Sequence, residues 1–219
     1  AVIEANKQGA FVFWNHPLWK GPELGDWREV QEQMYRNGWL HGIEVANGSN
    51  YYLEAHQWCY ERNLTMLGNS DIHAPSLTRE STHHEHRTVT LVFARDRSIE
   101  SVREAVFAGR TAVWAEDMLI GRERYVRALY EATVSVAPPH HRGGGRVYFE
   151  INNASPLDLE LERTGSQGPE SLVLPAGTTT LIEVATERPA ESATLQYRIV
   201  NLLVAPGEGL DIEIAIPAE

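Results

Sequence analysis

Cysteine is nearly absent from this sequence, because Cys59 is the only one among 219 residues. An intrachain disulfide is therefore impossible, and so is a zinc site built from cysteines. The net charge is −11 and no run of Lys and Arg is present, so the basic surface of a protein that binds duplex nucleic acid is missing. No apolar run approaches the roughly 18–20 residues of a membrane span. We therefore expect a small-molecule substrate, with neither duplex nucleic acid nor a membrane as partner.

Tryptophan and histidine are distributed unevenly along the chain. All six tryptophans and seven of the nine histidines lie in the first 114 residues, and the rest of the chain is rich in Val, Leu, Ile and Thr. The change in composition predicts two domains, residues 1–130 and 131–219.

The first domain alternates strand-like and helix-like segments. The expected strands are residues 10–14, 42–46, 65–68 and 88–94. Asp26 with Glu29 predicts a capping box for one helix, residues 51–63 predict a second, and Ser98 caps a third. Such alternation is typical of a mainly parallel sheet or barrel. Four strands are too few to close a barrel, so we expect the front half of the barrel to lie outside these 219 residues.

The second domain shows the period-two alternation of β-strands. The expected strands are residues 146–152, 158–162, 171–174, 179–184, 194–199 and 210–216. Turn-forming residues separate these segments, and several short strands at this spacing favour a β-sandwich. The fold class predicted for the whole chain is therefore α/β plus all-β. We expect the β-domain to stabilise the protein or to form a homo-oligomer.

Polar side chains suited to metal binding or substrate contact come directly after the first three strands. They are Asn15, His16, Asn47, Ser70, Asp71 and His73. The carboxyl ends of the strands form the active-site rim in α/β barrels. Asp71 offers hard oxygen and His73 borderline nitrogen, a mixture that suits Zn, Mn or Fe. Taken alone, Asp71 also fits a capped turn, and His16 fits an ordinary structural histidine at a strand end.

Three segments together resemble a known family. FVFWNHP, GIEVANG and LTMLGNSDIHAP are similar to the last motifs of the PHP (polymerase and histidinol phosphatase) family of metal-dependent phosphoesterases. The segment RTVTLVFARDRSIESVREAVFAGRTAVW is similar to the region after these motifs in the CehA-like and Sb-PDE-like phosphodiesterase branches. The resemblance covers about residues 1–130.

The resemblance implies the C-terminal half of a distorted (β/α)7 barrel with up to three divalent metal ions. It implies that His16, Asp71 and His73 are metal ligands, that Asp71 and His73 take part in catalysis, and that Asn47 lies near the site. The expected reaction is hydrolysis of a small phosphate ester by a metal-activated hydroxide. Diesters are the first expectation, and monoesters are the alternative. The family's opening His-x-His motif, its following acidic residue and a middle His and Glu have no counterpart here, so the expected shell is partial.

Other candidates carry weaker patterns. His86 and Arg87, with His83 and His84 before them, form either a clamp for substrate phosphate or a solvated loop. Glu44 lies inside a strand, where we expect a buried partner and keep a catalytic carboxylate as an alternative. A binding protein built on a decayed scaffold is the alternative to the enzyme. His16, Asp71 and His73 favour the enzyme, because a decayed site would have lost them. The sequence leaves the cellular compartment open, with a periplasmic or secreted location and a cytoplasmic one both compatible.

Overall fold

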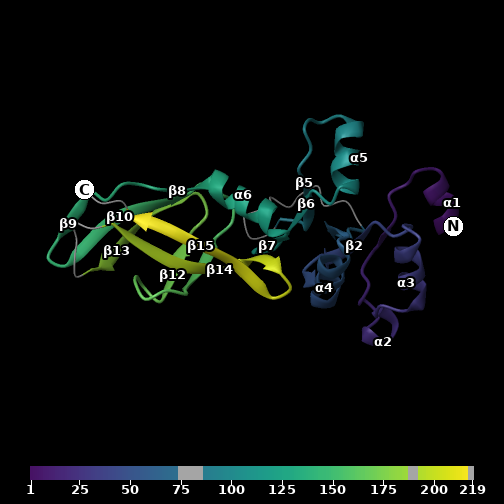
Figure 1. Cartoon of the computed structure of the whole chain (residues 1–219), viewed down its shortest axis with the longest axis horizontal. Helices are drawn as coiled ribbons and strands as arrows, with labels where there is room; N and C mark the ends of the chain where they lie inside the picture. The colour runs from purple at the N-terminus through teal and green to yellow at the C-terminus, as the bar shows by residue number, and fades with distance from the viewer. Residues whose placement is uncertain (74–85, 187–191, 217–219) are drawn as a thin grey trace. The chain divides into compact units, whose positions relative to one another are not determined.

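The computed structural model describes residues 1–73, 86–186 and 192–216. The chain forms two compact units (Figure 1). The first comprises Ala1–Tyr125 with Ala205–Gly207, and the second comprises Val126–Val204 with Glu208–Glu219. The division falls within helix α6 (Glu123–Thr133). None of the described helices is long and apolar enough to cross a membrane.

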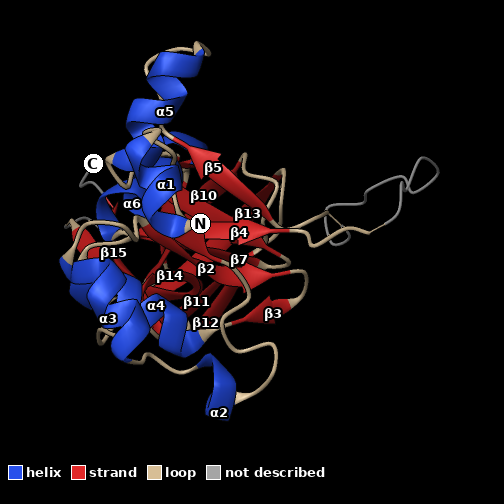
Figure 2. Ribbon diagram, turned by 90° about the vertical axis from the view of Figure 1, so that its right-hand side faces the viewer, coloured by secondary structure: helices blue, strands red, loops and turns tan. Residues whose placement is uncertain are grey.

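A parallel sheet organises the first unit. Strand β2 (Gly42–Asn47) pairs in parallel with β1 (Phe13–Trp14) on one side and with β4 (Thr65–Asn69) on the other. The short strand β3 (Asn50–Tyr51) turns back along β2. Every residue of β2 is buried, as expected for the central strand of a covered sheet. Figure 2 shows β2 and β4 next to each other in this unit. The expected parallel pairing of the first three strands is confirmed.

In the described part of the first unit, five helices accompany these strands. They are α1 (Val2–Lys7), α2 (Pro22–Gly25), α3 (Glu29–Arg36), α4 (Leu53–Arg62) and α5 (Ile99–Phe107). Helix α4 packs against β2 and buries four side chains, including His56 and Trp58. The cap predicted at Ser98 is confirmed, since its hydroxyl accepts the Ser101 N–H at 3.2 Å. The cap predicted at Asp26 is wrong. Helix α3 begins at Glu29, and the Gln31 side chain accepts the Arg28 N–H instead.

An antiparallel meander completes the first unit. Strands β5 (Val89–Val92), β6 (Thr111–Ala115) and β7 (Met118–Gly121) pair in sequence. The strand expected at residues 88–94 therefore exists, but its ladder is antiparallel. Thr90 Oγ1 accepts the Gly68 N–H at 2.9 Å and donates to the Gly68 carbonyl at 2.8 Å. A Cβ on Gly68 would lie 2.2 Å from Val113 Cγ1, so only glycine permits β4 to approach the meander this closely.

The second unit is built from two antiparallel sheets. One contains β8 (Val134–Val136), β9 (His141–Gly143), β10 (Arg146–Asn153) and β13 (Thr178–Ala185). The other contains β11 (Leu159–Arg163), β12 (Ser171–Leu174), β14 (Ala193–Ala205) and β15 (Glu208–Ile216). Burial alternates along β10 and β15, and the inward positions hold residues such as Phe149, Ile151 and Ile214. Alternation of this kind is the signature of a β-sandwich core.

Candidate metal centre at the carboxyl edge of the parallel sheet

The carboxyl ends of three parallel strands meet at one edge of the first unit's sheet. His16 comes after β1, Asn47 closes β2, and Asn69 closes β4 directly before Ser70 and Asp71. Residues 13–14 are in register with 42–43, and Asn47 is in register with Asn69. Because parallel strands end on the same side, this pairing gathers the polar residues that the sequence places at the strand ends.

Glu44 lies beneath this edge and is almost completely buried, with 1% of its surface exposed. Its Oε1 accepts the Asn69 side-chain amide at 2.7 Å. Its Oε2 accepts the Asn47 side-chain amide at 3.2 Å and also the backbone N–H of His16. The expectation that Glu44 is a buried partner is confirmed. One carboxylate thus joins the ends of β1, β2 and β4.

Two of the candidate metal ligands have unusual backbone conformations. His16 has φ +32° and Asp71 has φ +49°. Side-chain-bearing residues rarely adopt positive φ, and such strain persists only where surrounding contacts enforce it. The other two non-glycine cases have ordinary causes. Asn63 ends helix α4 in the left-handed conformation, and Glu116 lies in the β6–β7 turn.

The ring of His73 has the orientation that a metal-binding histidine needs. Its Nδ1 lies 2.6 Å from the carbonyl oxygen of Asp71. A carbonyl can only accept, so Nδ1 carries the hydrogen and Nε2 keeps its lone pair. Metal-bound histidines commonly donate their second ring N–H to a carbonyl in this way. His16 Nε2 lies 3.1 Å from the side-chain nitrogen of Asn15, and its ring contacts Trp19 edge to face at 5.6 Å.

These residues fit part of a shell for divalent metal ions. Exposed Asp71 and His73 supply an oxygen and a nitrogen ligand, and the tautomer of His73 suits coordination. Within residues 1–73, 86–186 and 192–216, no three His, Cys, Asp or Glu side chains form a group that could hold one ion. The described ligands are thus too few to enclose an ion by themselves, and the roles of His16, Asp71 and His73 as metal ligands stay a prediction.

The proposed phosphate clamp is only partly described. His83 and His84 lie outside the described residues. The ring of His86 lies against Trp114, with ring centroids 3.8 Å apart and the planes tilted by 39°. Its two nitrogens lie 2.8 Å from the carbonyl oxygens of Glu116 and Arg87. In this conformation the ring contacts the β6–β7 turn. A clamp formed by His86 and Arg87 stays a prediction, and so does a role for half-buried Ser70.

Tyr52 is a site residue that sequence reasoning missed. It precedes α4, its backbone N–H donates to the Val45 carbonyl at 2.9 Å, and its side chain is 8% exposed. Burial raises the pKa of the Tyr52 hydroxyl, and the nearby carboxylates of Glu44 and Asp71 raise it further. The charges of both acidic residues of the edge therefore act on the Tyr52 hydroxyl. A helix-flanking tyrosine carries no sequence signal for that position.

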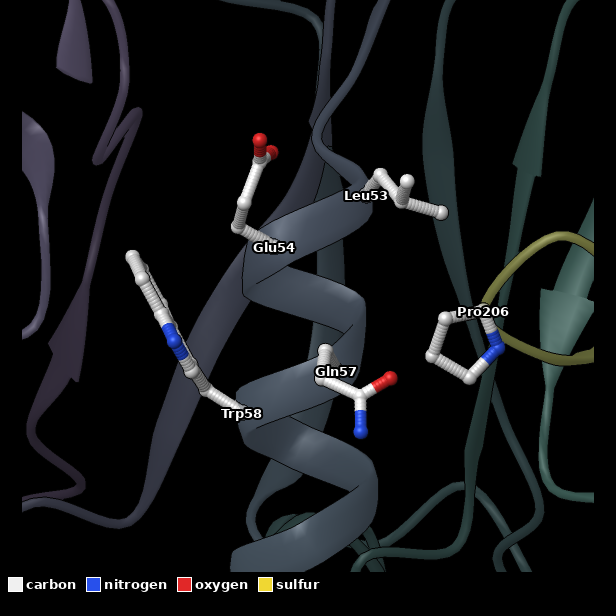
Figure 3. A pocket seen from close by; sticks show the side chains of 5 residues that line it. All are labelled: Leu53, Glu54, Gln57, Trp58 and Pro206. Carbon is white, nitrogen blue, oxygen red and sulfur yellow. The ribbon is translucent and has the colours of Figure 1, made fainter.

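A separate hollow of about 270 Å³ lies along helix α4. Figure 3 shows Leu53, Glu54, Gln57 and Trp58 of the helix, with Pro206 facing Leu53. Trp58 stacks on Trp14 with ring centroids 5.4 Å apart. None of the candidate metal ligands lines this hollow, so it is distinct from the edge that gathers them.

The fold and the site define a two-unit chain in which metal-type residues gather at the edge of an α/β sheet that precedes a β-sandwich. A family model described as an Ig-like domain matches residues 134–215. A search of curated proteins gave no match.

A solved structure from Bacteroides vulgatus is similar over 99% of this chain, with 38% identity and a TM-score of 0.91. That protein is described as a two-domain protein containing a predicted PHP-like metal-dependent phosphoesterase. The match covers 65% of the relative, so the chain spans less than two thirds of its length. The likeness supports the general resemblance and the pairing of an α/β domain with a β-domain.

Proposed function

We propose that this chain carries part of the active site of a metal-dependent phosphoesterase, and that its preferred substrates are small phosphodiesters. One observation carries the proposal: three parallel strands bring His16 and the Asp71–His73 segment to the same sheet edge, with the His73 lone pair free to coordinate. The 38% identical relative, described as a predicted PHP-like metal-dependent phosphoesterase, supports the same reaction class.

In this proposal His16, Asp71 and His73 hold up to three ions of Zn, Mn or Fe together with further ligands that are not among the described residues. Bound divalent ions supply Lewis acidity, which lowers the pKa of a water molecule and neutralises phosphate oxygens. Asn15 and Asn47 orient the substrate through their side-chain amides, and Asp71 orients the attacking water. His86 and Arg87 bind the phosphate once substrate is present.

The test uses the full-length natural protein. Elemental analysis gives the metals bound per chain, and hydrolysis of bis-p-nitrophenyl phosphate is compared with that of p-nitrophenyl phosphate. Asp71→Asn should lower kcat/KM by about 100-fold or more, because a neutral amide is a poor metal ligand. Asp211→Asn is the matched control, since Asp211 pairs with Arg198 in the second unit.

Two or more metals per chain with faster diester hydrolysis would establish the proposal. If the monoester is hydrolysed faster, the proposed site stands and the preferred substrates are phosphomonoesters. A protein without metal that leaves both esters intact after addition of Mn²⁺ or Zn²⁺ would refute the enzyme and favour a binding role.

A further inference from the structure

The carboxylate of Glu44 is the point at which the three parallel strands are connected by side chains. Its hydrogen-bond donors are the His16 backbone N–H and the amides of Asn47 and Asn69. Each donor belongs to the end of a different strand. Two of them are close to candidate ligands, because one is the backbone of His16 itself and Asn69 precedes Asp71 by two residues.

A local irregularity of β2 accompanies this arrangement. The register with β4 shifts between Glu44 and Ala46, so Glu44 faces Leu67 while Ala46 already faces Gly68. The extra residue is Val45. Bulges of this kind re-aim a side chain, and they are frequent beside active sites.

The energetics of Glu44 argue against a role in stability alone. Burying a carboxylate costs several kcal/mol of solvation. Its described hydrogen-bond partners are all neutral N–H groups, and no ion pair of Glu44 is found in the described part of the chain. A buried charged group is for that reason weak evidence for a contribution to stability. Glu44 is therefore explained better by what its hydrogen bonds position.

The strained backbone at the candidate ligands needs contacts that hold it, and Glu44 supplies such contacts. Positive φ at His16 and Asp71 is unfavourable without enforcing contacts. Glu44 holds the His16 N–H directly and holds the end of β4 through Asn69. Both strained positions are thus anchored to the same carboxylate.

We propose that Glu44 is a positioning residue for the metal centre: it fixes the backbone of His16 and the end of β4 so that His16 and Asp71 point at the ions. The inference rests on the proposed function, and it adds a residue that supplies no metal ligand. Groups that orient metal ligands typically change metal affinity about 10- to 100-fold when they are removed.

The decisive variant is Glu44→Gln in the full-length natural protein. It keeps the size of the side chain but brings an amide nitrogen against donor groups. Mn²⁺ affinity, measured by electron paramagnetic resonance of the unbound ion, should weaken about 10- to 100-fold. The visible absorption of bound Co²⁺ should also shift, because the ligand geometry changes. Neither readout depends on turnover.

The matched control is Ile43→Val, the preceding residue on the same strand, which is completely buried. It should lower the melting temperature while leaving Mn²⁺ affinity and the Co²⁺ spectrum unchanged. Asn69→Ala, which removes one of the three donors, should weaken Mn²⁺ binding roughly 3- to 10-fold, less than loss of the whole carboxylate. Asn69→Ala takes the place of Glu44→Gln in this experiment if Glu44→Gln does not fold.

The outcomes separate the two proposals. If the unmodified protein binds Mn²⁺ and hydrolyses the ester but neither variant changes affinity or spectrum, the positioning role is refuted and the proposed function stands. If Ile43→Val weakens Mn²⁺ as much as Glu44→Gln, the effect is general destabilisation and the inference also fails. An unmodified protein that binds no metal refutes both.

Discussion

In each unit of the molecule a buried polar side chain joins several segments, Glu44 in the first and Asn153 in the second, and the two differ in how their atoms are satisfied. In the second unit, the amide of Asn153 donates at 2.8 Å to the carbonyls of Leu157 and Leu174. Its oxygen accepts both the N–H and the hydroxyl of Ser155. In the first unit, Glu44 brings a negative charge that meets only neutral donors. A matched neutral amide suits a structural role, whereas a buried charge indicates a role beyond stability.

Backbone conformation separates the two units in the same way. The positive-φ residues described in the second unit are Gly144, Gly145, Gly168 and Gly177, which tolerate that conformation. The first unit adds four residues that bear side chains, and two of them, His16 and Asp71, are candidate ligands, while Asn63 and Glu116 lie at a helix end and in a turn. Two of the four strained positions thus coincide with metal-type side chains, and strain of this kind is common at functional sites.

Replacing Asn153 should give the largest loss of stability. Asn153→Ala removes the buried partner of the Leu174 carbonyl and of the Ser155 N–H, whereas the Leu157 carbonyl keeps the hydrogen bond from the Ser155 hydroxyl. At 1–3 kcal/mol for each unsatisfied group, partly relieved by water, we expect a loss of about 3–4 kcal/mol. Urea unfolding followed by far-ultraviolet circular dichroism measures it.

Mn²⁺ affinity distinguishes Asn153→Ala from Glu44→Gln. Asn153→Ala should bind Mn²⁺ as the unmodified protein does, whereas Glu44→Gln should not. If Asn153→Ala also loses metal affinity at a temperature where it is folded, the assignment of the two side chains to different roles is wrong.

Acid should weaken the first unit through His56, which is 0% exposed. The hydroxyl oxygen of Tyr51 lies 2.8 Å from Nδ1 of His56, and Nε2 of His56 has no hydrogen-bond partner in the described structure. Burial, aided by the charge of Arg122, lowers the pKa of His56 to about 4. The unfolded chain binds a proton near pH 6.5 while the folded protein does not. Stability should therefore be complete above about pH 6.5 and fall by about 3 kcal/mol towards pH 4.

All six tryptophans lie in the first unit, so tryptophan fluorescence during urea unfolding reports this effect. Aspartate and glutamate side chains generally titrate near pH 4 as well. The pH dependence of stability is therefore compared with that of His56→Leu, which lacks the imidazole. The variant should show a flatter dependence on pH between 6.5 and 4.5. Equal slopes for the two proteins would contradict a neutral buried imidazole.

Much of the candidate site could be predicted because its signals are local. Short apolar strands ending in His16, Asn47 and Asp71 are visible in the sequence, and parallel strands must end together. The six strands expected in the second unit are present for an equally simple reason, since period-two alternation directly reflects the two faces of a sheet. Only their ends differ, most clearly in β14, which extends to Ala205.

The features that were not predicted depend on contacts between distant segments. The bulge at Val45 aims Glu44 at three strand ends, and a bulge has no reliable signature in a single sequence. The charge of Asp71 acts on Tyr52 in the folded chain, where α4 packs on β2, although 19 positions separate the two residues in the sequence. Strand β5 pairs with β6, and β6 pairs in turn with β7; neither β6 nor β7 was among the expected strands.

Two tyrosines, one in each unit, allow the two units to be compared by removing a single hydroxyl group. These substitutions have the smallest expected effects. Tyr197 is completely buried in the second unit and donates its hydroxyl to the Pro169 carbonyl at 2.9 Å. Tyr197→Phe should therefore cost about 1 kcal/mol of unfolding free energy, the net value of one hydrogen bond, and leave hydrolysis unchanged.

Tyr52→Phe should do the opposite. No described hydrogen bond depends on its hydroxyl, so stability should change by less than about 0.5 kcal/mol. Because the charge of Asp71 acts on this hydroxyl, we expect the hydroxyl to contact the substrate, and kcat/KM for bis-p-nitrophenyl phosphate should fall about tenfold, or about 1.4 kcal/mol. If Tyr52→Phe instead loses stability and keeps full activity, Tyr52 is a packing residue like Tyr197, and the substrate lies on the other side of Asp71.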